Sequence, residues 1–205
     1  MPVIGIDIGT GGSRAVVVGD DGRLLASETV EHVPFASAKA AWAEQDPDDW
    51  WRAAQQATRA AMRASGAGAR DITSVGLSGQ MHGAVLLDER GDVLRPSIIW
   101  CDQRTDAECA WLDDVVGRDR LLELTLNPAL TNFTLTKLLW VRAHEPAIWA
   151  RVRHVLLPKD YVRFRLSGEY AIDVADASGT LMLDVARRRW SDDLLRAVDI
   201  DRALL

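Results

Sequence analysis

The sequence predicts an α/β fold: a mixed sheet with antiparallel opening strands and flanking helices. Two apolar, β-branched runs surround a short Gly-rich turn within residues 3–18, and a third run follows at residues 24–30. An amphipathic helical pattern then occupies residues 47–64. Apolar runs at residues 72–78 and 84–87 precede further helical stretches, and such alternation is typical of α/β chains.

The composition narrows the class of protein. With 205 residues, the chain is long enough for one large domain or two small ones. Its hydrophobic content of 48% and charged content of 26% are ordinary for a globular protein. The net charge of −6 argues against nucleic acid or an anionic membrane as the main partner.

The cysteines and the apolar runs indicate a cytoplasmic protein. Cys101 and Cys109 lack the spacing of a metal site and fit a reducing compartment as plain thiols. No apolar run approaches the ~18 residues of a membrane span. The chain enters a strand directly, so we expect no signal peptide.

The turn of the first hairpin predicts an anion site. Gly11 lets the backbone approach a ligand, Thr10 and Ser13 supply hydroxyls, and Arg14 supplies a planar cation suited to phosphate. Asp7 ends the first strand beside this turn. Since a carboxylate repels a phosphate unless a divalent cation bridges them, we expect Asp7 to bind Mg²⁺ through water.

An ordinary hairpin with a Gly-rich turn is the alternative interpretation of the same residues. The pattern Gly-x-x-x-x-Gly-Lys-Ser/Thr is missing, which excludes a Walker-type loop. The turn leads into a strand and not a helix, which argues against a dinucleotide site.

The first long helix has clear end signals. Asp46 and Pro47 are typical of an N-cap and a first helical position, and Gly66 and Gly68 end the pattern. Tryptophans 42, 50 and 51 could stack on a sugar, although the core is the favoured place for the two on the helix.

A polar loop at residues 79–83 separates two apolar strands, where α/β domains often place ligand contacts. Its His82 is either a partner for a sugar hydroxyl or a structural histidine. A short buried strand at residues 97–100 leads to Asp102 and Arg104. These two could bind polar ligand groups, but a helix cap at Asp102 and a surface ion pair are the simpler interpretations.

The later part of the chain is mostly helical in pattern. We expect helices at residues 105–115, 119–125, 135–143, 146–153, 158–166 and 192–198, the last capped by Ser191. We expect strands at residues 154–157 and 181–185, a small-residue acidic loop at 173–180 and a turn at 186–189.

Seven short motifs occur along the chain in a fixed order. They are Ile-Asp-Ile-Gly-Thr-Gly-Gly-Ser-Arg (6–14), Trp-Ala-Glu-Gln-Asp-Pro-Asp-Asp-Trp-Trp (42–51), Gly-Gln-Met-His-Gly (79–83), Trp-Cys-Asp-Gln-Arg (100–104), Lys-Leu-Leu-Trp (137–140), Leu-Pro-Lys-Asp-Tyr (157–161) and Ser-Gly-Thr (178–180). Together they resemble the FGGY carbohydrate kinases over nearly the whole chain.

The resemblance implies an actin-like, RNase H-like lobe, the first of two, spanning residues 1–205 and incomplete. It implies ATP and Mg²⁺ as cofactors. Their contacts would be Asp7 as the catalytic metal ligand and Thr10, Gly11, Ser13 and Arg14 for the phosphates. The implied sugar contacts are Gln80, Met81, His82, Trp100 and Asp102.

The loop at residues 79–83 is similar to that of the family members that phosphorylate D-xylulose, whereas glycerol-phosphorylating relatives carry an Arg-Glu pair there. The resemblance therefore implies phosphoryl transfer from MgATP to the 5-hydroxyl of D-xylulose. Another ketose or a polyol as substrate, and a truncated, non-catalytic sugar-binding lobe, are the alternatives. Cys101 stands where Asn is common in these relatives, and Asn132 stands where the family usually has a small residue.

The family is longer than this chain. By resemblance, its general base, an Asp, and the second lobe with most of the adenine pocket are expected beyond Leu205. A homodimer is a possible assembly of this protein, and the sequence does not determine the oligomeric state.

Overall fold

The computed structural model describes residues 1–205, which fold into two compact units. The first unit comprises Met1–Pro34, Asp46–Gln80 and Pro158–Glu169. The second unit comprises Phe35–Gln45, Met81–Leu157 and Tyr170–Leu205. Each unit is therefore assembled from segments that are distant in the sequence.

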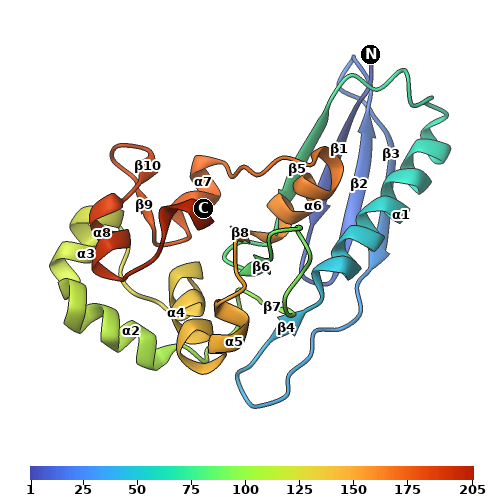
Figure 1. Ribbon diagram of the computed structural model, residues 1–205. Coiled ribbons are helices and arrows are strands. Elements are labelled where there is room, and N and C mark those ends of the chain that lie inside the picture. The colour runs from blue at the N-terminus through green and yellow to red at the C-terminus, as the bar shows by residue number, and fades with distance from the viewer. The chain divides into compact units, whose positions relative to one another are not determined.

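A four-stranded mixed sheet forms the centre of the first unit (Figure 1). Its strands are β1 (Val3–Ile8), β2 (Gly12–Val18), β3 (Leu24–Glu31) and β5 (Val75–Gly79), in the order β3-β2-β1-β5. The first three strands are antiparallel neighbours, and β5 is parallel to β1. This confirms the predicted mixed sheet with antiparallel opening strands, although β5 starts at Val75 and not at residue 72.

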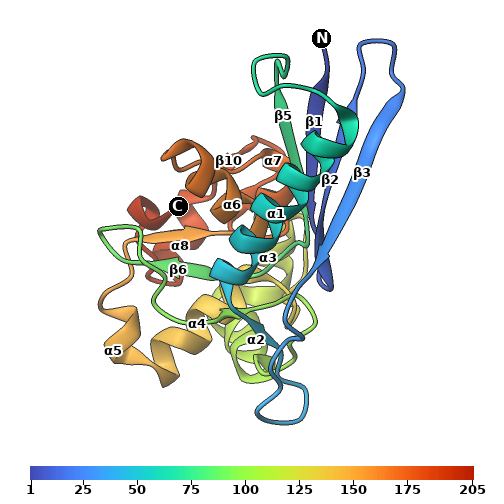
Figure 2. The same ribbon diagram turned by 90° about the vertical axis from the view of Figure 1, so that its right-hand side faces the viewer.

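Helices α1 (Pro47–Ser65) and α6 (Pro158–Ser167) pack on the sheet and on each other (Figure 2). The Asp46 carboxylate accepts a hydrogen bond from the Asp48 amide, and Gly66 ends α1 with a left-handed φ of 71°, as the sequence predicts. Ile4, Ile6 and Ile8 of β1 are buried, so the residues that alternate with them point to the opposite face of the sheet.

The second unit contains short strand pairs. They are β4 (Glu44–Gln45) with β7 (Ser97–Ile98), β6 (Val85–Leu87) with β8 (His154–Leu156), and β9 (Leu183–Asp184) with β10 (Arg189–Trp190). Its helices are α2 (Asp106–Leu112), α3 (Arg118–Thr125), α4 (Thr134–His144), α5 (Pro146–Trp149), α7 (Val174–Ser178) and α8 (Asp192–Ala197). A π-helical turn, Asp113–Gly117, joins α2 to α3, and a 3₁₀ turn, Arg202–Leu204, follows α8.

Helix α4 lies in the hydrophobic core of the second unit. Its first eight residues, 134–141, are all buried, which is typical of a helix surrounded by other elements. Leu135 and Leu138 have no exposed surface and belong to a core cluster that also includes Leu121 and Leu194. None of the helices in the structure combines the length and hydropathy that a membrane crossing requires.

Several predicted elements are wrong in the second unit. The expected loop at 173–180 contains α7, because the Asp173 carboxylate accepts from the amides of Ala175 and Asp176 and starts a helix. The strand expected at 181–185 is reduced to β9, and β10 begins within the expected turn at 186–189.

Two further differences follow from long-range pairing. The helix expected at 146–153 is only α5, since the Arg153 amide donates to the carbonyl of Leu87 where β8 joins β6. Strand β4 was not expected at all. Its two residues are extended because they pair with β7, more than 50 residues away.

Candidate functional site

The β1–β2 turn is a tight connection whose backbone is crowded. The Gly9 amide donates to the Gly12 carbonyl over 3.0 Å, which closes the turn. A Cβ on Gly12 would lie 2.8 Å from the Val30 carbonyl oxygen, so β3 leaves room only for glycine there. Thr10 and Gly11 form the tip of the turn, and Gly11 is exposed. The turn is thus closed by a backbone hydrogen bond, and Gly11 stays exposed at its tip.

Ser13 supports the turn from inside. Its side chain is completely buried, and its Oγ lies 2.9 Å from Nε2 of His32. His32 also approaches the Thr10 carbonyl with Nδ1, at 3.4 Å, and its amide donates to the Gly11 carbonyl. Burial lowers the pKa of His32 below 6.5, which favours the neutral ring. The Ser13 hydroxyl therefore contacts His32 on the inner side of the turn.

His32 belongs to none of the seven sequence motifs, and no local pattern marks it. Its position follows from the register of β2 and β3, which pairs Gly12 with Glu31 and brings the next residue under the turn. Only the strand pairing reveals this support.

Asp7 and Arg14 lie opposite each other in the β1–β2 register, and both are exposed. Residues in register on neighbouring antiparallel strands share a face of the sheet. Nε of Arg14 donates to the Thr29 hydroxyl over 3.1 Å, and no ion pair joins it to Asp7. The Asp7 carboxylate therefore faces solvent without a protein cation.

This carboxylate fits a Mg²⁺ ion that keeps most of its water. The structure contains no group of three or more His, Cys, Asp or Glu side chains arranged to hold a metal. Mg²⁺ in phosphate sites usually takes one or two carboxylates and completes its shell with water and phosphate oxygens. Asp7 beside an exposed Gly-rich turn matches that donor set.

Gln80 follows β5 and lies against the same turn. Its amide donates to the Ile8 carbonyl over 2.7 Å, and its Nε2 lies 3.4 Å from the Gly9 carbonyl oxygen. The residue is buried. We predicted Gln80 as a sugar contact, and in this structure its side chain bonds the hairpin turn.

Two of the sequence motifs meet between α1 and α6. The Tyr161 hydroxyl donates to Oδ1 of Asp48 over 2.5 Å, and Nη1 of Arg165 lies 2.6 Å from the same oxygen. Burial and this carboxylate raise the pKa of Tyr161, which keeps the phenol protonated. These motifs therefore join the two helices that cover the sheet.

In the second unit, Met81 and Trp100 present large exposed side chains, with 52% and 42% of their surface accessible. The Ala84 amide donates to the Ile98 carbonyl in an antiparallel bridge. The segment before Ala84 and the segment after Ile98 therefore leave the bridge at the same end, which places Met81 and Trp100 on neighbouring loops.

His82 belongs to the first of these loops and is held by hydrogen bonding. Its Nδ1 lies 2.8 Å from the Gly179 carbonyl oxygen. A carbonyl oxygen only accepts, so Nδ1 carries the proton. Burial lowers the pKa of His82 below 6.5, and the neutral ring leaves Nε2 as a hydrogen-bond acceptor. Such a nitrogen is suited to a ligand hydroxyl.

Asp102 is completely buried, and its carboxylate is already hydrogen-bonded. Its Oδ2 accepts from the Ala43 amide over 2.6 Å and from Nη2 of Arg104 over 2.7 Å. Its Oδ1 accepts from the amide and Nε of Arg104. The predicted Asp102–Arg104 ion pair is therefore present, but its predicted place on the surface is wrong, because the side chains are only 0% and 1% exposed. The carboxylate fixes the loop that carries Trp100.

The predicted helix cap at Asp102 is also wrong. Helix α2 begins at Asp106, and Thr105 occupies the N-cap position without a side-chain cap bond. Asp102 instead binds the amide two residues on, a local turn that competes with helix formation.

Two of the tryptophans considered for sugar stacking, Trp42 and Trp50, have structural surroundings. Trp50 is completely buried in α1. The Arg104 guanidinium lies 3.7 Å from the ring centroid of Trp42 and 4.8 Å from that of Trp140. Trp42 thus covers the buried Asp102–Arg104 pair.

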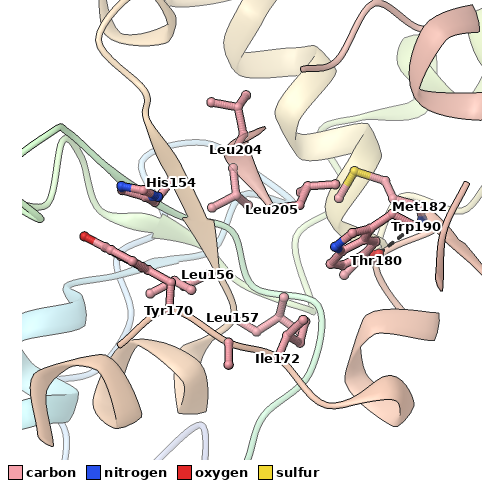
Figure 3. Close-up of a pocket in the computed structure, with 12 residues that line it drawn as sticks. His154, Leu156, Leu157, Tyr170, Ile172, Thr180, Met182, Trp190, Leu204 and Leu205 are labelled. Atoms are coloured by element: carbon pink, nitrogen blue, oxygen red, sulfur yellow. Dashed lines mark hydrogen bonds between the residues drawn. The ribbon is translucent and has the colours of Figure 1, made fainter. Parts of the chain in front are cut away.

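A cavity of about 250 Å³ in the second unit contains none of the predicted site residues (Figure 3). Leu204, Leu205 and Trp190 line it together with His154, which stacks on Tyr170 at 3.8 Å between ring centroids. The Thr180 hydroxyl in its wall accepts from the Met182 amide and donates to a carbonyl. Its largely apolar lining offers a sugar few polar partners.

The predicted site residues therefore divide into two groups. Asp7, Thr10, Gly11, Ser13, Arg14 and Gln80 belong to the first unit, at one end of its sheet. Met81, His82, Trp100 and Asp102 belong to the second unit, on two loops that leave one bridge.

Comparison with known proteins identifies the family. The sequence model of the FGGY family of carbohydrate kinases, N-terminal domain, matches residues 2–205. The chain is 47% identical over 201 residues to a xylulose kinase of Klebsiella pneumoniae and 45% identical to one of Escherichia coli K12. Each alignment covers 97% of this chain and 40% of the relative, so the chain spans about 40% of the length of these curated relatives.

A solved structure has the same fold. The crystal structure of a xyloylose kinase from Brucella ovis matches with a TM-score of 0.95 and 39% identity, over 100% of this chain and 42% of that one. This match confirms the predicted actin-like lobe. With the family match over nearly every residue, it shows that the chain belongs to the FGGY family of carbohydrate kinases.

Proposed function

We propose that the chain is the N-terminal lobe of a sugar kinase that transfers the γ-phosphoryl group of ATP to the 5-hydroxyl of D-xylulose. The observation that carries this proposal is the 45–47% identity to xylulose kinases along 97% of the chain. The neutral His82, whose Nε2 can accept a hydrogen bond from a hydroxyl, and the Gly-rich turn would supply the two kinds of contact that such a reaction needs.

The first unit would bind the phosphates. Phosphoryl transfer depends mainly on positioning and on stabilising charge. The backbone amides of Thr10 and Gly11, at the tip of the turn, would donate to phosphate oxygens, and Arg14 would contribute a positive charge on the same sheet face as Asp7. Asp7 would hold Mg²⁺ through water, and the bound ion would neutralise charge on the phosphates.

The second unit would bind the sugar. His82 would accept a hydrogen bond from a sugar hydroxyl, and Met81 and Trp100 would cover apolar parts of the sugar. Asp102 would act indirectly, since its buried carboxylate fixes the loop of Trp100. The general base and the remainder of the nucleotide site are proposed to lie in a part of the protein that follows this chain, as the resemblance implies.

The test compares the 205-residue chain with the product of the complete reading frame that carries it. A coupled assay for ADP release would be run with D-xylulose, D-ribulose, gluconate and glycerol. We expect the complete product to turn over D-xylulose with the highest kcat/KM and the 205-residue chain to be inactive. A preference for another ketose or a polyol would overturn the substrate. D-Xylulose binding without turnover by the complete product would favour a non-catalytic sugar-binding protein.

A further inference from the structure

The backbone of His82 is in an unfavourable conformation. Its φ of 63° lies in the left-handed region, which a residue with a side chain seldom adopts. Such a conformation persists only when the surrounding structure holds it, and it is common at ligand-binding sites. The groups that hold the main chain of His82 therefore also affect the position of its side chain.

Two side chains of helix α4 donate hydrogen bonds to the carbonyl of His82. Nζ of Lys137 donates to this oxygen over 3.0 Å, and the Thr134 hydroxyl donates to it over 3.2 Å. Lys137 is completely buried, and its ammonium group also donates to the Asn132 carbonyl. The lysine thus bonds main-chain oxygens of two segments that are 50 residues apart.

Burying an ammonium group is costly, so its retention in the core calls for an explanation. Burial lowers the pKa of Lys137 to about 7, although the nearby Asp102 favours the charged form. A methionine or leucine would fill the same space without this cost. What these apolar residues cannot do is donate to the His82 carbonyl.

The imidazole of His82 is positioned by Gly179. The Gly179 carbonyl accepts from Nδ1, and a Cβ on Gly179 would lie 2.5 Å from Cε1 of His82. The ring of Phe133 meets the imidazole edge-on at 5.0 Å. The ring therefore has one position and one tautomer, with Nε2 left as the acceptor.

We infer that Lys137 is a positioning residue for the proposed sugar site: with Thr134 it fixes the main chain of His82, so that Gly179 can set the ring with Nε2 toward a substrate hydroxyl. This inference rests on the proposed function. It gives a purpose to the Lys-Leu-Leu-Trp and Ser-Gly-Thr motifs, which neither substrate contacts in the proposal above.

The test uses the product of the complete reading frame as wild type and as K137M, T134V and T136V. Methionine retains the length and apolar stem of the lysine and removes its ammonium. Thr136 is a matched control, because it is as buried as Thr134 on the same helix but its hydroxyl donates to the Phe133 carbonyl over 2.9 Å. The readouts are KM for D-xylulose, KM for ATP, kcat, and nitrogen NMR of the histidine rings.

We expect K137M to raise KM for D-xylulose by about tenfold and T134V to raise it by about threefold. These are the losses expected for one hydrogen bond from a charged donor and one from a neutral hydroxyl. KM for ATP should change by less than about twofold, since a local effect is expected, and T136V should match the wild type. The His82 signals should lose the single Nδ1-protonated pattern in K137M. A folded K137M whose sugar KM and His82 signals equal those of the wild type would overturn the inference.

Two further outcomes are also decisive. If K137M does not fold, the comparison of T134V with T136V takes its place, with KM for D-xylulose and the His82 NMR signals as the readouts. Equal values for these two variants would overturn the inference. If the wild type does not phosphorylate D-xylulose, the proposed function fails. The NMR comparison then still decides whether Lys137 and Thr134 position His82, because it needs no substrate.

Discussion

Nδ1 of His82 lies 2.8 Å from the carbonyl oxygen of Gly179, 97 residues further along the chain. Gly179 has φ of −77° and ψ of 0°, a backbone conformation that alanine also adopts. Glycine is needed here for space alone, because any Cβ would overlap the His82 ring.

Gly179→Ala should therefore displace the ring without straining the backbone. We expect a loss of about 1–3 kcal/mol in the free energy of unfolding, as for other overpacked sites, and a higher KM for the sugar. Urea unfolding and steady-state kinetics would measure both. Ser178→Ala is the control, since the Ser178 hydroxyl donates to the Ala175 carbonyl in the same turn. Equal sugar KM values for the two variants would contradict this interpretation.

Sugar binding should weaken as the pH falls. Burial first, and then the Lys137 charge, lower the pKa of His82 below 6.5, while Gly179 and Asp176 oppose them. Protonation adds a hydrogen to Nε2 and removes the acceptor. His82 takes up this proton at a higher pH in the unfolded chain than in the folded chain. The contribution of neutral His82 to the stability of the fold is therefore complete above pH 6.5, and it is lost as the pH falls through the pKa of His82 in the folded protein.

The measurement is KM for D-xylulose between about pH 5 and pH 8, the range in which a histidine titrates. His82→Asn retains a donor and an acceptor but does not titrate. Its sugar KM should be raised and should lack the increase toward low pH that protonation of His82 produces, whereas any change near pH 7 that both proteins share belongs to Lys137, whose pKa is about 7. A wild-type profile with the same pH dependence as that of the asparagine variant would show that the His82 charge is irrelevant to binding.

Ser13→Ala should loosen the β1–β2 turn by removing the bond to His32. We expect a loss of about 1 kcal/mol in stability and a higher KM for ATP, with KM for the sugar unchanged. Ser27→Ala, on the neighbouring strand β3 and exposed, is the matched control. Kinetics with each substrate varied in turn would check this, and a change in sugar KM alone would count against a phosphate-binding turn.

Asp7→Asn should impair catalysis with little effect on folding, because the carboxylate is exposed and has no protein cation. We expect kcat to fall by about 100-fold or more and the Mg²⁺ concentration for half-maximal rate to rise. ADP release over a Mg²⁺ titration measures both. Asp21→Asn, in the turn after β2, should behave as the wild type. An unaltered Mg²⁺ dependence in Asp7→Asn would exclude the metal assignment.

Asp102→Asn tests a structural against a direct contribution to sugar binding. Breaking one partner of a buried ion pair typically costs about 3–5 kcal/mol, and both Asp102 and Arg104 are buried. We expect a loss of this order in urea unfolding. Full stability together with a large rise in sugar KM would instead support a direct contact between Asp102 and the sugar.

Local signals in the sequence were sufficient for the hairpins and the capped helices. Apolar, β-branched runs around a Gly-rich turn predicted β1 and β2, and Asp46, Pro47 and Gly66 predicted the ends of α1, because these signals depend on neighbouring residues only. The short elements were harder. Strand β4 exists only through its pairing with β7, and α7 depends on the Asp173 cap within a stretch of small residues.

The sequence by itself determined the family, the mixed sheet and the residues around which a site is proposed, since ordered motifs and periodicity are properties of the chain alone. Only the tertiary structure decided what those residues do next to one another. It turned Ser13 toward His32, closed Asp102 within a buried pair, and set His82 between Lys137 and Gly179. The hydrogen bonds from Ser13 to His32, from Ala43 to Asp102, from Lys137 to His82 and from His82 to Gly179 join residues 19, 59, 55 and 97 positions apart, and no local pattern records such distances.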